Sequence, residues 1–238
     1  MPDKIKTGLK TALAEKRSHL SYFNIAISVD CVIFSFHEKK LKVLLIKSDL
    51  KEFKGLNSLI GDLVKPNEDL DAASYRILKQ RTGLTDVYLN QVHTFGAVNR
   101  HPSGRVITTA YYSLVHINSE KLILSTNELH WHSVDEIDEL AFDHKRILEL
   151  CLSKLREEVM EHPIIFNLLP EKFSLKELQL VYEAVLGQVL DRRNFRKKVA
   201  LKGWLIELNE LAKDVKHRPG RLYKLKPSFK QKYAQHLL

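Results

Sequence analysis

One side of a predicted helix in the last third of the chain carries side chains that can contact nucleic-acid bases. At about 100° per residue, Phe195 and Val199 share one side of a helix over 192–201. Arg193 and Lys197 point the opposite way. Arg can bind guanine edges through two hydrogen bonds, Asn can bind adenine, and Lys neutralises phosphates. The pattern predicts a helix that enters a DNA groove; the alternative is a basic surface helix without a target.

A basic loop follows this helix and favours the same interpretation. The strand-like segments 204–208 and 222–225 can pair across a cationic loop with a Pro-Gly turn, as in the wing of a winged helix. Ser174 and Glu177 form a capping box that predicts a further helix over 175–186. Together these elements predict a winged helix-turn-helix. The predicted DNA-binding residues are Lys176, Arg192, Arg193, Asn194, Arg196, Lys197 and Lys198 on the helices, and Lys216, His217, Arg218 and Arg221 in the wing.

The distribution of charge along the chain supports DNA binding. The chain has 38 Lys and Arg, 29 Asp and Glu, and a formal net charge of +9. Residues 161–238 hold 16 of these basic residues and 8 of the acidic ones, so nearly all of the excess lies in the last third. Such an imbalance is expected where a module that binds a polyanion follows a near-neutral domain.

The composition excludes several other classes of protein. Of the 238 residues, 44% are apolar and only 9 are Gly and 7 Pro, which indicates one large or two ordinary globular domains. Cys31 and Cys151 are isolated thiols, as in a reduced intracellular protein. No apolar run approaches the roughly 20 residues that cross a bilayer, and the charged N-terminus does not match a secretory signal. We therefore expect a cytoplasmic protein that does not enter the membrane.

Few other residues suggest chemistry of their own. His130 and His132 would share one face of a strand, but no third metal ligand is evident in the sequence, so no metal site is predicted. The sequence contains no Gly-rich phosphate loop and no nucleophile elbow. Asp30 is a single carboxylate in an apolar strand, where it needs a partner or a ligand.

The hydrophobic pattern predicts the elements that must position these residues. The expected strands cover 23–36, 41–47, 86–97 and 106–117, and the further expected helices cover 4–18, 70–81 and 142–160. A polar hairpin over 37–40 should join the first two strands, and Gly83 should end the helix over 70–81. Pro163 is the expected boundary between two parts of the chain.

The segment around the helix over 70–81 carries Glu68, Arg76, Gly83 and Leu84 at a fixed spacing. In this register the segment resembles the Nudix box, the loop-helix-loop with which Nudix hydrolases hold divalent metal ions. The residues that replace its loop glycine and its metal-binding acids are Asp62, Ile77, Gln80 and Arg81. Mg²⁺ requires several negatively charged oxygens, and pyrophosphate cleavage requires the ion. The resemblance therefore implies a Nudix fold without hydrolase activity, and we expect no metal or cofactor.

The Nudix resemblance also implies a pocket between the sheet and the loop before the box helix. The candidate ligand-binding residues are Asp30, Lys47, Asp62, Glu68 and Tyr112. Each has an ordinary alternative, because Asp30 could pair with Lys47. Glu68 could cap the box helix, and Tyr112 could belong to the core. Without metal-holding acids, a small sugar gripped by carboxylates and an aromatic ring fits better than a nucleoside diphosphate, and L-arabinose is the specific prediction.

Further runs resemble the Nudix-related transcriptional regulators, in which an N-terminal Nudix sensor domain is fused to a C-terminal winged helix. The matching runs are 140–144, 173–179, 181–183, 191–198, 218–219 and 222–223. The run Asp-Arg-Arg-Asn-Phe-Arg-Lys-Lys over 191–198 is the most specific of them. The resemblance implies a homodimer that binds double-stranded DNA at a palindromic operator. Members of that family sense ADP-ribose in the control of NAD synthesis, or regulate sugar catabolism.

Together these observations predict an α+β protein, with a Nudix-like α/β/α sandwich around a mixed sheet followed by a winged helix-turn-helix. The predicted parts are an N-terminal helix (1–21), a ligand-sensing domain (22–150), the end of a linker helix (151–163) and a DNA-binding domain (164–238). The predicted function is a dimeric repressor of carbohydrate utilisation that responds to a sugar and has no enzymatic activity. Two alternatives stay open: an ADP-ribose-sensing regulator of NAD metabolism, and an active Nudix pyrophosphatase.

Overall fold

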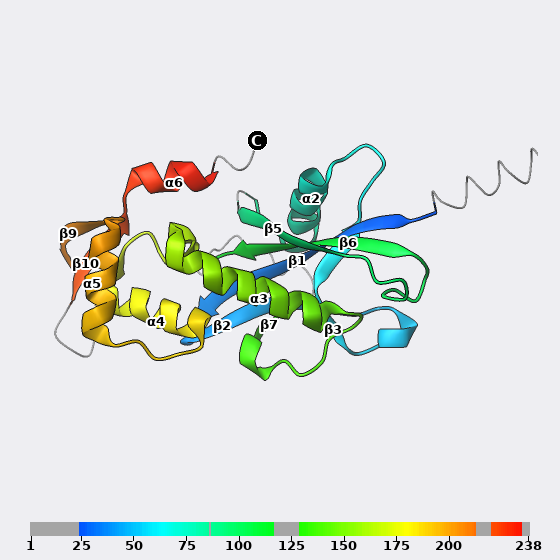
Figure 1. The fold of residues 1–238 in the computed structure, drawn as a ribbon, viewed down its shortest axis with the longest axis horizontal. Coiled ribbons are helices and arrows are strands. Elements are labelled where there is room, and N and C mark those ends of the chain that lie inside the picture. Colours follow the sequence, from blue (N-terminus) through cyan, green and yellow to red (C-terminus); the bar gives the residue numbers. More distant parts are fainter. Residues whose placement is uncertain (1–23, 86, 117–128, 213–219, 235–238) are drawn as a thin grey trace, which may run out of the picture.

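Figure 1 shows a computed structural model of the protein, and the structure describes residues 24–85, 87–116, 129–212 and 220–234, the last four by their backbone alone. The helix predicted over 4–18 lies outside the described residues, as do Lys216, His217 and Arg218 of the predicted wing. The orange elements of the C-terminal part gather at the left end of the long axis in Figure 1. In the described part of the chain no helix is both long and apolar enough to cross a membrane.

Seven strands among the described residues form a mixed sheet. They are β1 (Ala26–His37), β2 (Lys40–Lys47), β3 (Asn57–Ser58), β4 (Ile60–Leu63), β5 (Tyr88–Phe95), β6 (Val106–Leu114) and β7 (Leu129–Ser133). The main path is β3-β2-β1-β6-β5, with β4 paired to β1 and β7 paired to β2. Strands β1 and β6 run parallel and the other pairs are antiparallel, so the predicted mixed sheet is confirmed.

A tight hairpin joins β1 and β2, as the polar residues 37–40 predicted. Glu38 and Lys39 adopt φ angles of 53° and 61°, the left-handed conformation that a two-residue turn of type I′ requires. The hairpin sets Phe34 opposite Val43, which keeps both apolar side chains on the same face of the sheet.

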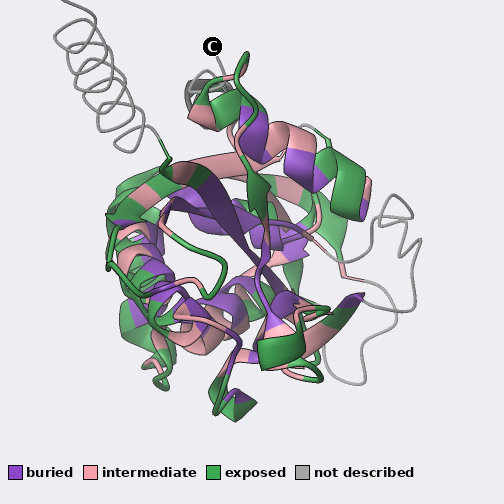
Figure 2. Cartoon of the chain, turned by 90° about the vertical axis from the view of Figure 1, so that its right-hand side faces the viewer, coloured by how far each residue is buried: buried purple, intermediate pink, exposed green. Residues whose placement is uncertain are grey.

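Helices α2 (Leu70–Thr82) and α3 (His144–Glu161) cover opposite faces of this sheet (Figure 1). Side chains along a strand alternate between faces, so Cys31 and Ile33 of β1 pack toward α2, whereas Val32 and Phe34 pack toward α3. Figure 2 shows the buried strands between helices whose outer surfaces are exposed. The predicted α/β/α sandwich is confirmed.

The end of α2 at Gly83 was predicted, whereas its cap is Asp69 and not Glu68, the residue suggested as a cap. Asp69 accepts a hydrogen bond from the backbone N–H of Ala72 at 2.7 Å and caps the start of the helix. Gly83 adopts a φ of 71° and ends the helix, because glycine has no Cβ and enters the left-handed conformation without strain. The box helix therefore extends one residue beyond the predicted range of 70–81.

Strand β1 changes its neighbour halfway along its length. Residues 28–31 pair with β4, whereas residues 34–37 pair with β2. The neighbouring strands therefore diverge at this edge of the sheet, and a cavity opens beside the first half of β1. Strands β3 and β4 were not predicted, since strands of two and four residues are too short to show a period.

The second part of the chain forms the predicted winged helix-turn-helix. Its elements are a 3₁₀ segment (Pro163–Leu168), β8 (Phe173–Ser174), α4 (Leu175–Leu186), α5 (Arg192–Lys202), β9 (Leu205–Leu211), β10 (Arg221–Leu225) and α6 (Pro227–Ala234). Strands β9 and β10 form the hairpin of the wing, and β8 completes a three-stranded sheet. Helix α6 was not predicted, because its 8 residues carry too few apolar positions for a helical period.

The two parts share one hydrophobic core. Buried residues continue from the α3 face of the sheet through Leu155 and Ile165 to Val181, Phe195 and Trp204 of the winged helix. Helix α3 ends just before Pro163, the predicted boundary, and a 3₁₀ segment begins there, but the packing continues across it. A shift in one part must therefore be accommodated by the other, because close-packed cores deform little.

The capping box of α4 provides a test of local stability. Ser174 Oγ accepts from the backbone N–H of Glu177 at 3.2 Å, and the Glu177 carboxylate accepts from the backbone N–H of Ser174 at 2.7 Å. Removing this cap with Ser174→Ala should lower the free energy of unfolding by about 1 kcal/mol, measured by urea denaturation. Lys176→Ala on the same exposed turn is the control and should change it by less than about 0.5 kcal/mol. Equal effects of the two substitutions would contradict the role of the cap.

Candidate functional site

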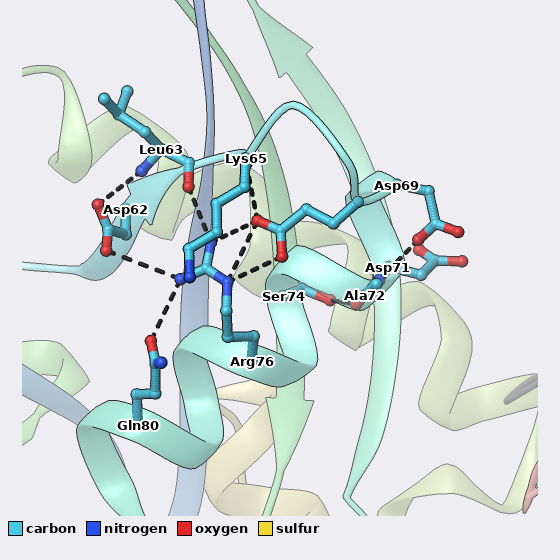
Figure 3. Close-up of polar contacts among 10 residues, drawn as sticks. Asp62, Leu63, Lys65, Asp69, Asp71, Ala72, Ser74, Arg76 and Gln80 are labelled. Atoms are coloured by element: carbon cyan, nitrogen blue, oxygen red, sulfur yellow. Dashed lines mark hydrogen bonds and ion pairs between the residues drawn. The ribbon is translucent and has the colours of Figure 1, made fainter.

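Arg76 fastens the loop of the Nudix-like box to its helix, mainly through an ion pair with Glu68 and also through a longer one with Asp62 at 3.9 Å (Figure 3). The Glu68 carboxylate accepts from Arg76 Nε at 2.8 Å and from Arg76 Nη2 at 2.5 Å. Arg76 also donates to the backbone carbonyl of Leu63 at 2.9 Å and to Gln80 Oε1 at 3.2 Å. The hydrogen bonds from Arg76 lower the pKa of Glu68 to about 2. Glu68 thus holds the box loop in place and does not line the cavity, contrary to its predicted ligand role.

The positions where Nudix hydrolases hold metal do not fit a divalent cation here. Ile77 is buried in the core, Gln80 accepts from Arg76, and Arg81 brings a positive charge. Within the described ranges, no cluster of three or more His, Cys, Asp or Glu side chains could hold a metal ion. The donor set that Mg²⁺ prefers is therefore missing from this part of the chain.

A cavity of about 840 Å³ lies beside the first half of β1, where its neighbouring strands diverge. Its charged lining consists of Asp30, Lys47, Asp49, Asp62, Arg81, Arg100 and Arg105, besides His101 and His144. Three of the predicted ligand residues, Asp30, Lys47 and Asp62, thus lie at one cavity. Four cations from three separate segments converge there, and of these only Lys47 was predicted.

Asp30 is not a solitary carboxylate. It is buried, with its two oxygens 3.5 Å from Arg100 Nη2 and 3.6 Å from His144 Nε2. Arg100 is also held by Asp143, through contacts of 2.7 Å and 3.0 Å. The alternative of an ion pair between Asp30 and Lys47 is wrong, since Lys47 instead donates to a backbone carbonyl at 3.1 Å. Each oxygen of Asp30 therefore already has a partner within the protein, at or just beyond the long end of hydrogen-bonding distance.

His144 begins α3 and connects it to the sheet. Its Nδ1 accepts from the backbone N–H of Leu59 at 3.0 Å and lies 3.1 Å from Ser58 Oγ. Burial lowers the pKa of His144, so the ring is neutral near pH 7, and the hydrogen bond at Nδ1 assigns its proton to Nε2, which faces Asp30. The run 140–144 was part of the family resemblance, but no role was predicted for this histidine.

An aromatic wall that was not predicted borders the cavity. The rings of Phe142 and His101 stack with centroids 5.0 Å apart and an interplanar angle of 18°. Phe53 packs against Phe142 at 4.4 Å. Phe142 has a φ of 56°, which is rare for a large side chain and indicates that the surroundings hold it there. The spacing of apolar residues in a sequence does not reveal a left-handed backbone conformation of this kind.

Tyr112 does not join the cavity. Its hydroxyl donates to Glu158 at 2.6 Å, near the C-terminal end of α3, and its ring is fully buried. Glu158 and His144 are separated along α3 by about 21 Å, at 1.5 Å per residue. The structural alternative, in which Tyr112 belongs to the core, agrees with this position.

Helix α5 presents the surface expected of a recognition helix. Phe195 and Val199 are buried against the rest of the winged helix, as predicted. The polar residues of α5 that are exposed include Arg192, Arg193, Asn194, Arg196, Lys197 and Lys198. Lys176 is exposed on α4. Arg221 is paired with Glu207 across the hairpin, which offsets the charge predicted for this part of the wing.

Helix α3 connects the cavity to the winged helix. Its first residue, His144, lines the cavity. Near its other end, the Tyr182 hydroxyl of α4 donates to the Val159 carbonyl at 3.1 Å. Arg156 Nε donates to the Val185 carbonyl of α4 at 2.8 Å. Helix α3 therefore contacts both the cavity and α4 of the winged helix.

The fold and the two surfaces define a class of protein, in which a Nudix-like ligand domain is joined to a DNA-binding winged helix. Comparison with known families supports this assignment over most of the chain. Residues 25–151 match the NUDIX domain, and residues 165–225 match the NrtR DNA-binding winged helix domain.

Comparison with individual proteins agrees with both matches. The chain is 30% identical over 203 residues to the ADPR responsive transcriptional repressor NtrR of Acinetobacter baylyi, covering 83% of this chain and 81% of that protein. The crystal structure of Shewanella oneidensis NrtR with a 27mer DNA aligns with a TM-score of 0.76 and 29% identity, covering 86% of this chain and 95% of that one. The chain therefore belongs to the NrtR family of Nudix-related transcriptional regulators.

A third relative is an enzyme. The ADP-ribose pyrophosphatase of Methanocaldococcus jannaschii is 30% identical over 128 residues, which cover 54% of this chain and 73% of that protein. The similarity spans about half of this chain. It agrees with a Nudix fold in the first part of the chain. Whether this chain has the same chemistry depends on the residues at the site.

The ion pair of the box loop can be tested by titration. Because Arg76 lowers the pKa of Glu68 to about 2, the stabilisation from this pair is complete above the unfolded pKa of about 4.3 and is lost as the pH falls toward 2. Arg76→Gln should raise the pKa of Glu68 toward the ordinary value, measured by NMR of the side-chain carboxyl carbon. Gln80→Ala leaves both partners in place and should change it little. An unaltered titration in Arg76→Gln would contradict the pairing.

Proposed function

We propose that this NrtR-type regulator is a repressor that binds ADP-ribose in the cavity beside β1 and releases its operator in response. The observation that carries the proposal is the convergence of four cationic side chains on one cavity, those of Lys47, Arg81, Arg100 and Arg105. The volume of about 840 Å³ lies within the range of roughly 300–1,000 Å³ typical of small-molecule sites. The A. baylyi relative, which is described as ADPR responsive, supports the same effector.

The sugar hypothesis loses its basis in this cavity. It required several free carboxylates, but Asp30 is held by Arg100 and His144, and Glu68 is held by Arg76. Tyr112, the aromatic ring of that hypothesis, lies elsewhere. A diphosphate between a base and a sugar suits the cationic lining better than L-arabinose does, so we favour the regulation of NAD metabolism over that of carbohydrate utilisation.

The aromatic wall suits the adenine of ADP-ribose. Flat aromatic rings favour stacked arrangements, and base stacking on such rings contributes about 1–3 kcal/mol per base. Phe142 and His101 line the same cavity as the cations. Burial lowers the pKa of His101, so its ring is neutral near pH 7 and can serve as a stacking surface.

We propose further that the protein does not hydrolyse the effector. Cleavage of a pyrophosphate needs a metal ion to offset charge on the attacking and leaving oxygens. The residues that replace the metal-binding acids are Ile77, Gln80 and Arg81. The replaced acids favour a regulator over the alternative of an active pyrophosphatase, although one relative is named an ADP-ribose pyrophosphatase.

For DNA we propose that α5 enters the major groove and that two copies bind the halves of a palindromic operator. The exposed face of α5 carries Arg193, Asn194 and Lys197, which suit bases and phosphates. A symmetric dimer places two such helices one helical turn of DNA apart, which accounts for a palindromic site. Since α3 contacts both the cavity and α4, the binding of the effector can bias the position of this helix.

The recognition helix can be tested with two substitutions that differ in kind. Arg193→Ala should weaken operator binding by about 1–3 kcal/mol and relax the preference at one base pair. Lys197→Ala should weaken specific and scrambled DNA alike and reduce the slope of log affinity against log salt by about 1. Both are measured by fluorescence anisotropy on a duplex selected by the protein from a random pool.

The matched control for these measurements is Lys79→Ala, which removes an exposed cation from α2 and should change neither quantity. Equal losses on specific and scrambled DNA in Arg193→Ala would refute base recognition by α5. A salt slope near zero for the wild type would refute DNA binding through phosphates.

The aromatic wall can be tested with ligands that differ in the base. Phe142→Leu should weaken ADP-ribose binding by about 1–3 kcal/mol, because it removes the stacking surface. Binding of ribose 5-phosphate, which has no base, should change much less. Isothermal titration calorimetry measures both, and anisotropy reports whether ADP-ribose still releases the operator. Equal losses for the two ligands would indicate damage to the cavity and contradict stacking.

A further inference from the structure

The cations of the cavity differ in how many hydrogen bonds and ion pairs they already make with other residues of the protein. Arg100 is held by Asp30 and Asp143. Arg105 donates to the Gly96 and Ala97 carbonyls at 2.8 Å and 2.9 Å. These cations are largely committed to holding loops in place.

Arg81 is different. It lies in the last turn of α2, is exposed, and lines the cavity. Within the described part of the chain, no hydrogen bond or ion pair engages its guanidinium. Its charge is therefore available to a ligand.

The position of Arg81 in the Nudix box also indicates what its free guanidinium could do. It occupies the second of the two metal-binding acid positions that precede Gly83 in the Nudix box. The other acid positions hold Ile77, which is buried, and Gln80, which accepts from Arg76. A divalent cation would meet a positive charge here instead of carboxylate oxygens.

We infer that the cavity binds a diphosphate without a divalent metal ion, and that the Arg81 guanidinium takes over the role of the metal in neutralising it. The inference rests on the proposed function, since it concerns the diphosphate of ADP-ribose. Guanidinium groups bind phosphate oxygens through two parallel hydrogen bonds, and these charge-assisted bonds are among the strongest that side chains form. The same substitution that removes hydrolysis thus preserves affinity for the uncleaved ligand.

The test compares ligand binding with and without metal. Isothermal titration calorimetry of the full-length protein with ADP-ribose should give dissociation constants within about twofold of each other in Mg²⁺ and in EDTA. Arg81→Ala should weaken binding roughly tenfold or more in both buffers, the loss expected for charge-assisted hydrogen bonds. Arg81→Lys should recover part of the affinity, because it restores the charge without the planar fork.

Lys79→Ala is the matched control. Lys79 is an exposed cation on the same turn of α2, but it does not line the cavity. Its removal should leave binding within about twofold of wild type. A thermal melt of each variant establishes that these exposed substitutions leave the fold intact.

Inorganic pyrophosphate, titrated in EDTA, separates this inference from the choice of effector. If ADP-ribose fails to bind but pyrophosphate binds and requires Arg81, the proposed effector is wrong and the metal-free site stands. If ADP-ribose binds only in Mg²⁺, or binds equally well to Arg81→Ala, the inference is overturned and the proposed function survives. If neither ligand binds, both are overturned.

Discussion

Burying a carboxylate costs free energy unless charged and hydrogen-bonding partners surround it, and the Nudix-like domain is organised around one such group. Asp30 on β1 faces Arg100 from the loop before β6 and His144 from the start of α3. It also packs closely over Gly61 of β4, where any side chain would collide with the carboxylate. Four separate segments are therefore positioned by one group. The position of Arg100 in the cavity and the start of α3, the helix that leads to the winged helix, both depend on that arrangement.

The Nudix-like box keeps the residues that hold its structure but not those that would bind a metal ion. Glu68 and Arg76, which fasten the loop to the helix, are retained and form a bidentate ion pair. The acids that would hold metal are replaced, one of them by Arg81. The Nudix fold is thus retained here while the charge at one metal-binding position of the box has changed sign. This change agrees with the proposed function, in which the protein binds its effector without turnover.

The continuous core explains how such a sensor can act at a distance. Buried residues link the α3 face of the sheet with α4, α5 and Trp204, so the two parts are not joined by a loose linker. Helix α3 contacts the cavity at His144 and the winged helix near Val159. A ligand that favours one position of this helix would therefore bias the position of α5, which is the physical content of coupling between two sites.

The local features of this protein follow from the sequence alone. Ser174 and Glu177 form the predicted capping box, Gly83 ends the box helix, and the apolar face of α5 is buried as its spacing predicts. These features depend on residues within one or two turns of each other, so a single segment contains the information. The departures from the Nudix box are likewise readable without a structure.

The composition of the cavity was decided by tertiary structure. Arg100 lies 70 residues from Asp30 in the chain, and no local period connects them. Asp30 therefore looked solitary, and the sugar prediction followed from counting it and Glu68 as free acids. Tyr112 lies on a strand of the same sheet as Asp30. Its hydroxyl, however, contacts Glu158 near the C-terminal end of α3, far from the cavity. Long-range pairing determines which charges are already satisfied and which, like that of Arg81, remain for a ligand, because only the folded chain brings the partners within reach.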